Sequence, residues 1–400
     1  MQRPSSAAGA DRPPVDLTSS VPATPLRFIK PTLPAWEKVA SAYRSVYETG
    51  VITNGSLVER FEAAVAERLG VKHCVAVSSC TSGLILTLKA MNLRGEVIVP
   101  SFTFFATGEA LLWNGLRPIF ADCSPDTWNI DSADVARRIT PRTAAILAVH
   151  MYGNPADTEQ LSRIAAKSDV KLIFDAAHAF GSLREGIPVG SFGDAEVFSL
   201  SPTKLLVAGE GGLVTTNDAV LARRLRAARN YGDTGSYNPE ILGLNARMSE
   251  FNAALGIAGL DLVEKKVRRH NQIARLYTEL LRDLPGVRFQ CIREDDLSTC
   301  KDYSIHVTSK TGKSLAERLC ASLQRRNIPT KRYFYPPLHE QKIFTGIHTM
   351  RDLPLSVTES VSEGVVSLPI YESLSDEDVV NIAKHVAEVI RGLNLHEVHA

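Results

Sequence analysis

The most reactive candidate in the sequence is a lysine that follows a predicted strand. Lys204 ends the segment 199–204, SLSPTK, which comes directly after an apolar run, 195–198, typical of a buried strand. A glycine-rich turn, 209–212, separates this segment from the next predicted strand. A lysine held on a strand-end loop can lose its proton, attack a carbonyl carbon and form a Schiff base. A solvent-exposed lysine without a chemical role is the alternative, because most lysines are exposed.

A second strand end carries a carboxylate. Asp175 follows the apolar run 171–174, and a carboxylate at the end of a buried strand is costly unless it is paired. The protonated pyridine nitrogen of pyridoxal phosphate is a natural partner, and the resulting pyridinium is an electron sink for a carbanion at an amino-acid carbon. An N-cap for the next helix is the alternative role. His178, three residues further on, could face the hydroxyl of the same cofactor.

Two further segments fit the same cofactor. Residues 78–83, SSCTSG, open directly into a predicted helix, where free backbone N–H groups and hydroxyls suit a phosphate, although a plain N-cap is the alternative. Residues 100–107, PSFTFFAT, place aromatic side chains after another strand, and one ring could stack on a pyridine face. The order of these signals, with the aspartate and then the lysine, is the order that a type I pyridoxal phosphate fold uses.

The elements that must position these groups alternate along the chain. Apolar runs predict strands at 74–77, 96–99, 117–121, 144–150, 171–175, 195–198 and 213–216, with helices between most of them. This alternation predicts an α/β fold with a largely parallel sheet covered on both faces, which binds ligands at the carboxyl ends of its strands. A capping box at 56–59 predicts the start of one helix, and a single long helix is predicted over 249–281.

The pattern divides the chain into four parts. Residues 1–25 are rich in Pro, Ala, Ser and Thr and predict a disordered leader. Residues 26–248 predict the large cofactor-binding α/β domain, and 249–284 a long linking helix. Residues 285–400 predict a smaller C-terminal α+β domain.

The composition excludes several classes of protein. The 400 residues carry a formal net charge of +1, so no large field attracts a nucleic acid or an anionic membrane. No apolar run reaches the roughly 18 residues of a membrane span, and the first residues do not form a signal peptide. The six cysteines include no C-x-x-C pair, so neither a metal site nor a disulfide framework is predicted. We therefore expect a cytoplasmic protein with small-molecule partners.

From about residue 25 to about residue 393, the chain closely resembles the DegT/DnrJ/EryC1/StrS family of sugar aminotransferases. The matching segments are 70–79, 100–107, 175–181, 199–212 and 243–250, and the segments 367–371 and 374–378 are also similar. Cys80 and Ser82 stand where this family frequently has glycine and alanine, and Ser201-Pro202 replaces the more frequent His-Ala. These differences remove no group that the chemistry requires.

The resemblance implies a type I pyridoxal phosphate aminotransferase fold and a role for each matching residue. Lys204 would form the Schiff base, Asp175 would pair with the pyridinium nitrogen, and His178 would lie near the phenolic oxygen. The other implied cofactor contacts are Phe104 over the ring, Thr81, the backbone of Ser82 and Ser199 at the phosphate, and Asn245 reaching across from a second subunit. A homodimer with shared active sites follows. Arg247 and His339 are weaker candidates for binding substrate.

The resemblance also implies an activity: transfer of an amino group from L-glutamate to a nucleotide-linked 4-keto-6-deoxy sugar, with ping-pong kinetics. The Gly209-Glu210 form of the glycine-rich turn is more similar to family members that aminate C4 than to those that aminate C3, where an aspartate is usual. A 3-keto sugar nucleotide and a cyclitol ketone of the scyllo-inosose type remain alternative substrates.

Other classes of protein fit the sequence less well. A sugar dehydratase of the family would have histidine in place of Lys204, and a desulfurase would need a recognisable catalytic cysteine. A catalytically dead interaction protein is opposed by the intact Lys204 and Asp175.

Overall fold

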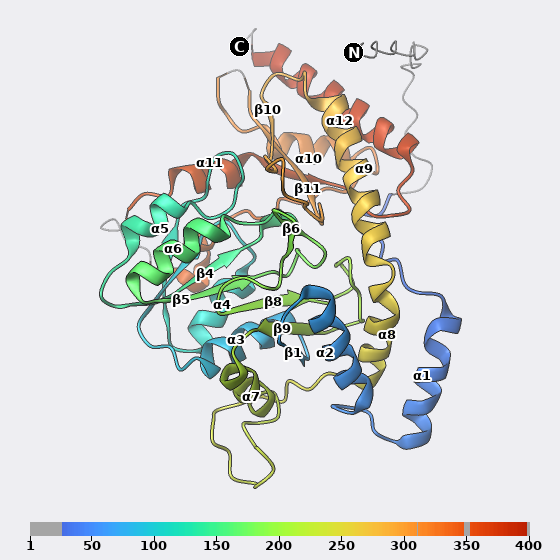
Figure 1. Ribbon diagram of the computed structural model, residues 1–400. Coiled ribbons are helices and arrows are strands. Elements are labelled where there is room, and N and C mark those ends of the chain that lie inside the picture. The colour runs from blue at the N-terminus through green and yellow to red at the C-terminus, as the bar shows by residue number, and fades with distance from the viewer. Residues whose placement is uncertain (1–25, 310, 348–352, 398–400) are drawn as a thin grey trace, which may run out of the picture.

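The computed structural model describes residues 26–309, 311–347 and 353–397, and the predicted leader, 1–25, lies outside them (Figure 1). The helices are α1 (Trp36–Thr49), α2 (Ser56–Leu69), α3 (Cys80–Ala90), α4 (Phe105–Trp113), α5 (Ser132–Arg138), α6 (Thr158–Ser168), α7 (Ala219–Ala228), α8 (Glu250–Leu260), α9 (Val263–Leu281), α10 (Ala316–Gln324), α11 (Ser356–Gly364) and α12 (Asp376–Glu397). The strands are β1 (His73–Val77), β2 (Glu96–Pro100), β3 (Arg117–Ala121), β4 (Thr143–Val149), β5 (Lys171–Asp175), β6 (Leu183–Arg184), β7 (Ile187–Pro188), β8 (Ala195–Ser199), β9 (Gly212–Thr216), β10 (Val287–Phe289), β11 (Tyr303–Val307) and β12 (Val365–Leu368). None of the helices in these ranges is long and apolar enough to cross a membrane.

The larger sheet confirms the predicted, mostly parallel α/β architecture. Its seven strands run in the order β1-β9-β8-β5-β4-β2-β3. The pairs from β8 through β5, β4 and β2 to β3 are parallel, whereas β9 is antiparallel to both of its neighbours. The loop 200–211 between β8 and β9 contains no crossover helix, so the chain returns in the opposite direction. Lys204 lies in this returning loop.

Helices cover both faces of this sheet (Figure 1). On one face, α3, α4 and α7 pack against strand side chains such as Val97, Leu147 and Val214. On the other face, α2 and α8 pack against one half of the sheet, and α5 and α6 pack against the half that contains β4 and β5. Burial on both faces explains why the strands read as continuous apolar runs in the sequence.

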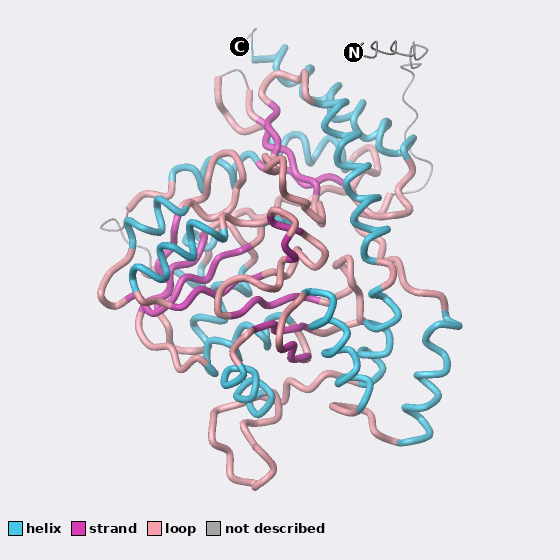
Figure 2. The backbone as a smooth tube through the Cα atoms, viewed as in Figure 1, coloured by secondary structure: helices cyan, strands magenta, loops and turns pink. Residues whose placement is uncertain are grey.

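A second, antiparallel sheet follows in the C-terminal part of the chain. Its strands run in the order β10-β11-β12, and α9, α10 and α12 contribute to the apolar core beside it. Figure 2 shows its strands as a separate magenta group beyond the larger sheet. This arrangement agrees with the predicted α+β content of the region after residue 284, while the exact domain boundaries stay a prediction.

The predicted single helix over 249–281 is wrong, because the structure has two helices, α8 and α9. Asp261 and Leu262 separate them, although the backbone of both residues keeps right-handed helical angles. The Leu262 N–H donates to the carbonyl of Gly259 (3.0 Å), so a tighter, 3₁₀-type hydrogen bond replaces the regular α-helical bond at the joint. The apolar pattern continues through such a joint and therefore does not reveal it.

The predicted capping box at 56–59 is also wrong. The N-cap of α2 is Gly55, and no side chain of its own segment caps the helix. Instead, the Glu250 carboxylate accepts hydrogen bonds from the backbone N–H groups of Gly55 (2.8 Å), Leu57 (2.9 Å) and Val58 (3.0 Å). A distant carboxylate can satisfy several unpaired N–H groups and also lies favourably at the positive end of the helix dipole.

This cap predicts that Glu250→Ala lowers the free energy of unfolding by about 3 kcal/mol, because buried N–H groups lose their acceptor. The measurement is urea unfolding at a fixed protein concentration, followed by circular dichroism. Glu264→Ala is the matched control, since Glu264 makes an ion pair with Arg68 at 3.2 Å but its side chain is 72% exposed. An unfolding midpoint of Glu250→Ala equal to that of the control would contradict the prediction.

Candidate active site

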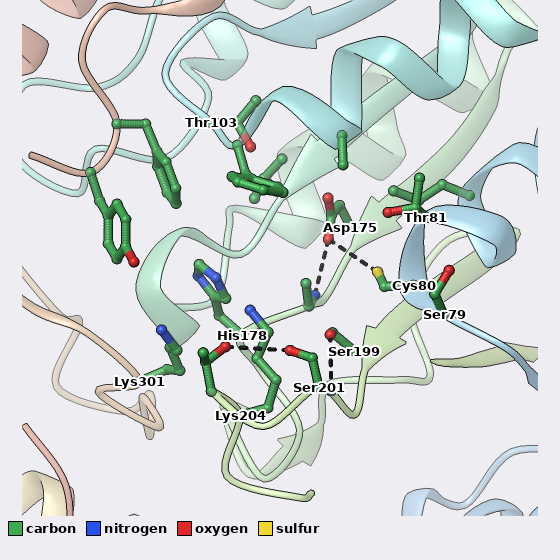
Figure 3. Close-up of a pocket in the computed structure, with 18 of the residues that line it drawn as sticks. Ser79, Cys80, Thr81, Thr103, Asp175, His178, Ser199, Ser201, Lys204 and Lys301 are labelled. Atoms are coloured by element: carbon green, nitrogen blue, oxygen red, sulfur yellow. Dashed lines mark hydrogen bonds between the residues drawn. The ribbon is translucent and has the colours of Figure 1, made fainter. Parts of the chain in front are cut away.

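A cavity of about 330 Å³ lies at the carboxyl ends of the strands of the larger sheet (Figure 3). The residues that line it come from the segments that follow β1, β2, β5 and β8, from Val149 at the end of β4, and from two further segments that contribute Lys301 and residues 333–334. Lys204, Asp175 and His178 all line this cavity, as do Thr81, Phe104 and Ser199. The structure therefore brings these six predicted residues together, because the carboxyl ends of parallel strands meet at one edge of the sheet.

Lys204 reaches the cavity from the loop between β8 and β9, and its side chain is partly buried. Burial, and then the positive charge of Lys301, lower the pKa of Lys204 to about 8. A pKa near 8 gives the amine a substantial neutral fraction at neutral pH, and only a neutral amine can attack a carbonyl. The environment of Lys204 is therefore that of a nucleophile.

Asp175 ends β5 and is only 6% exposed. Thr107 Oγ1 donates to Asp175 Oδ2 (2.7 Å) and the Ala177 N–H donates to Oδ1 (3.0 Å). Cys80 Sγ lies 4.0 Å from Oδ1, and burial keeps the pKa of this thiol well above its usual range. Burial raises the pKa of Asp175, whereas the hydrogen bonds from Thr107 and Ala177 act in the opposite direction. These donors favour the charged form of a carboxylate that is almost completely buried.

Thr107 is a site residue that the sequence did not single out. It lies in the first turn of α4, and its hydroxyl is also 3.1 Å from that of Thr103. Two buried hydroxyls thus form a short chain that ends on Asp175. A threonine inside an otherwise apolar helix start, FATGEALLW, was the available signal, but it did not indicate which carboxylate would be its partner.

His178 lines the cavity, and one of its ring nitrogens makes no hydrogen bond with the described residues. Its Nδ1 is buried and has no hydrogen-bond partner among the described residues. Its ring stacks on Phe334, with centroids 6.1 Å apart and an interplanar angle of 18°. Burial, and then the charges of Lys204 and Lys301, hold the pKa of His178 well below its usual range, so the imidazole is neutral.

The start of α3 forms the end of the cavity that lies away from Lys301 (Figure 3). Ser79 caps this helix: its Oγ accepts the Ser82 N–H (3.0 Å), while Ser82 Oγ accepts the Ser79 N–H (3.0 Å). The alternative N-cap role of this segment is therefore confirmed for Ser79, and the predicted phosphate contact of the Ser82 backbone stays a prediction. Gly212 lets β9 approach closely, because a Cβ there would be 2.6 Å from the Ser79 carbonyl carbon.

Four of the predicted residues, Ser82, Asn245, Arg247 and His339, are not among those that line the cavity. Asn245 is exposed, and Arg247 donates to Asn230 Oδ1 (2.7 Å) with its guanidinium 5.2 Å from the Tyr231 ring centre. His339 Nδ1 is 2.7 Å from Ser101 Oγ, and its side chain is not among those that line the cavity. Their assigned roles stay predictions, and that of Asn245 involves a second subunit.

Sequence reasoning assigned no contact to three further lining residues, Lys301, Tyr333 and Phe334. Lys301 lies between β10 and β11, and the other two lie between α10 and α11. Because they follow no strand of the larger sheet, the rule that identified the other lining residues could not find them.

Comparison with known proteins assigns the fold and the chemistry together. The family model of the DegT/DnrJ/EryC1/StrS aminotransferase family matches residues 36–387. The chain belongs to this family. A dTDP-4-amino-4,6-dideoxy-D-glucose transaminase of Escherichia coli is 33% identical over 359 residues, which cover 89% of this chain and 96% of that protein. A dTDP-3-amino-3,6-dideoxy-alpha-D-galactopyranose transaminase of Aneurinibacillus thermoaerophilus is 34% identical over 353 residues, covering 88% and 94%.

Among solved structures, the fold of this chain is similar to that of DesI in a crystal structure determined in the presence of its TDP-sugar product. The TM-score is 0.87 at 37% sequence identity, and the match covers 94% of this chain and 95% of that chain. These comparisons confirm the predicted family, the type I fold and the transaminase class.

Aminotransferases of this family depend on pyridoxal phosphate, and the cavity fits that cofactor. The buried Nδ1 of His178 has no hydrogen-bond partner in the described part of the chain, Asp175 is a hydrogen-bonded carboxylate, and a helix N-terminus opens on the cavity. The predicted contacts with Thr81, Phe104 and Ser199 require side chains that do line the same space. When bound, the cofactor supplies an aldehyde for an amine and an electron sink for the bonds broken at the amino-acid carbon.

The Thr107 contact predicts that Thr107→Val weakens binding of pyridoxal phosphate roughly tenfold, because Asp175 loses a donor that favours its charged form. Thr107→Ser keeps the hydroxyl and should bind the cofactor like the wild type. Quenching of tryptophan fluorescence measures the dissociation constant of both variants. Equal cofactor affinity in the valine and serine variants would show that the hydroxyl does not support Asp175.

Proposed function

We propose that this aminotransferase moves an amino group from L-glutamate to C4 of a nucleotide-linked 4-keto-6-deoxy sugar. The observation that carries the proposal is the meeting of Lys204, Asp175 and His178 in one cavity of a chain that matches sugar transaminases over most of its length. A dehydratase or a catalytically dead protein is a weaker candidate, because Lys204 is present and its pKa is lowered to about 8.

Each residue has a defined task in this proposal. Lys204 Nζ would hold the cofactor until the amino donor displaces it, and the freed amine would then move the proton between the α-carbon of the donor and the cofactor carbon as general base and acid. Asp175 would accept a hydrogen bond from the protonated pyridine nitrogen. The neutral His178 would lie near the phenolic oxygen, while Thr81 and Ser199 would hold the phosphate at the N-terminus of α3.

The position of amination is supported by two independent features. The Escherichia coli relative is named for a 4-amino sugar, and the Gly209-Glu210 turn here is more similar to C4-aminating members. Glu210 also lines the cavity. The Aneurinibacillus relative, named for a 3-amino sugar and 34% identical, makes a 3-keto sugar nucleotide the second candidate.

The substrate proposal predicts that the holoenzyme with L-glutamate converts a dTDP-4-keto-6-deoxy sugar at least about 100-fold more efficiently than its 3-keto isomer or scyllo-inosose. Nuclear magnetic resonance of the product identifies the aminated carbon, and 2-oxoglutarate release gives the rate. Lys204→Ala should form no amino sugar. Preferential turnover of the 3-keto isomer or of the cyclitol would overturn the choice of substrate but keep the transaminase.

We also propose a homodimer with shared active sites. A row of aromatic side chains, Trp36, Tyr43, Phe251 and Tyr47, runs over α1 and α8, with neighbouring ring centres 5.3 to 5.9 Å apart. Trp36 is 63% exposed and Tyr47 is 79% exposed. An exposed aromatic patch of this kind supports a protein interface. Contacts of Asn245 and Arg247 with a neighbouring cavity would then complete each site.

Mixing two inactive variants tests this arrangement. Lys204→Ala and Asn245→Ala homodimers should each be inactive or strongly impaired. After subunit exchange, half of the dimers carry one intact site, so the mixture should regain about a quarter of the wild-type activity. Sedimentation measures the oligomeric state in parallel. A monomer, or a mixture without any gain in activity, would contradict shared sites.

The cellular location remains part of the proposal. All six cysteines are free thiols, which supports a reducing compartment and hence the cytoplasm.

A further inference from the structure

A second lysine lines the cavity that contains Lys204. The Lys301 side chain is 3% exposed, and its ammonium lies 2.7 Å from Asp302 Oδ1 and 5.8 Å from the ring centre of Tyr333. In the view of Figure 3, Lys301 lies on the side opposite Ser79 and Thr81, with His178 and Lys204 between them. The proposed phosphate contacts are thus at the other end of the cavity.

The ion pair of Lys301 is expensive to bury and is incompletely satisfied. The Asp302 side chain is fully buried, and its Oδ2 has no hydrogen-bond partner among the described residues. Taking two charges out of water is repaid only when the remaining polar atoms also find partners. Because transamination needs a single lysine to bind the cofactor, a second buried cation at the same cavity calls for a function of its own.

We propose that Lys301 is a positioning residue that acts on Lys204 through its charge: it favours the neutral Lys204 amine that attacks the cofactor aldehyde, and Asp302 sets the strength of this effect. The inference rests on the cofactor-binding role of Lys204 in the proposed function. It requires no contact between Lys301 and the cofactor. A lysine beside another cation is an established way to activate an amine nucleophile.

The charges around Lys204 support this assignment. Lys301 is the group whose charge opposes the protonated amine, whereas Asp302, Cys80 and Asp175 favour it. Of these, burial keeps the Cys80 thiol protonated. The imidazole of His178 is neutral because its pKa lies well below the usual range. Glu210, also at the cavity, is exposed to water, which screens its charge.

Lys301 adds to the larger effect of burial on the pKa of Lys204, and its effect on reactivity has a definite sign. An amine gains nucleophilicity as the pH rises through its pKa, so a lower pKa makes it reactive at lower pH. With a pKa of about 8, Lys204 is neutral in roughly a quarter of the molecules at pH 7.5, against about one in a thousand for an ordinary lysine. Asp302 alone would raise the pKa of Lys204, so its carboxylate offsets part of the effect of Lys301.

The alternative role of Lys301, binding an anionic group of a substrate, is less well supported. Its charge is already balanced by the Asp302 carboxylate at 2.7 Å. An incoming carboxylate or phosphate would meet that negative charge as well as the ammonium. An effect on Lys204 needs no ligand to enter beside Asp302, and there the carboxylate offsets only part of the effect of Lys301.

The test uses the full-length protein freed of cofactor. Pyridoxal phosphate is added between pH 6 and pH 10, the attached cofactor is trapped with borohydride after short intervals, and mass spectrometry quantifies labelling at Lys204. Lys301→Met should move the midpoint of the pH-rate profile upward by about one pH unit and slow labelling roughly tenfold at pH 7.5. Lys301→Arg keeps the charge and should retain the wild-type midpoint. Asp302→Asn should move the midpoint downward.

The double variant Lys301→Met/Asp302→Asn covers the case in which a single variant fails to fold, because it removes both buried charges together. Its midpoint should lie above that of the wild type but below that of Lys301→Met. A midpoint at or below the wild-type value in this variant, or an unchanged midpoint in a folded Lys301→Met, overturns the inference. A raised KM for the keto sugar with an unchanged midpoint would assign Lys301 to substrate binding instead. Absence of labelling at Lys204 in the wild type would overturn the proposed function itself.

Discussion

A carboxylate at the end of a central strand has to be paired, hydrogen-bonded or protonated, and Asp175 imposes this requirement on the elements around it. Its donors come from its own turn and from the start of α4, and the thiol of Cys80 at the start of α3 lies close to it. Helices α3 and α4 must therefore begin at the same edge of the sheet where β5 ends. That edge is also where the cavity forms, so the constraint on one charge organises the site.

Charge balance links this edge to the C-terminal part of the chain. Lys204 and Asp175 come from the larger sheet, whereas Lys301 and Asp302 come from the segment before β11. Each set holds one cation and one anion, and neutral His178 lies beside them. Phe334, which stacks on His178, closes the cavity from the same C-terminal part. The site is complete only when the two sheets pack together, which is typical of enzymes that bind substrate between structural units.

The segment 243–250 shows how one stretch of sequence can serve both stability and function. Glu250 caps α2, while Ser249 caps α8 and pairs through a β-bridge with Thr53. These contacts fix the loop before α2 against the chain that carries Asn245. A motif shared with the family thus has a structural explanation in this subunit, independent of any contact that it makes with a second subunit.

The sequence by itself determined the strands and the residues at their ends. The predicted strands 117–121 and 171–175 agree with β3 and β5, because strands buried on both faces appear as apolar runs. The carboxyl ends of parallel strands meet, so Lys204, Asp175 and His178 could be placed together. Only the tertiary structure decided the α8–α9 joint, the cap of α2 by Glu250, the hydrogen bond from Thr107 to Asp175 and the position of Lys301 at the cavity. Local sequence patterns indicate turns and burial along the chain. These features instead depend on contacts between distant side chains or on a single backbone hydrogen bond, and neither produces a periodic pattern in the sequence.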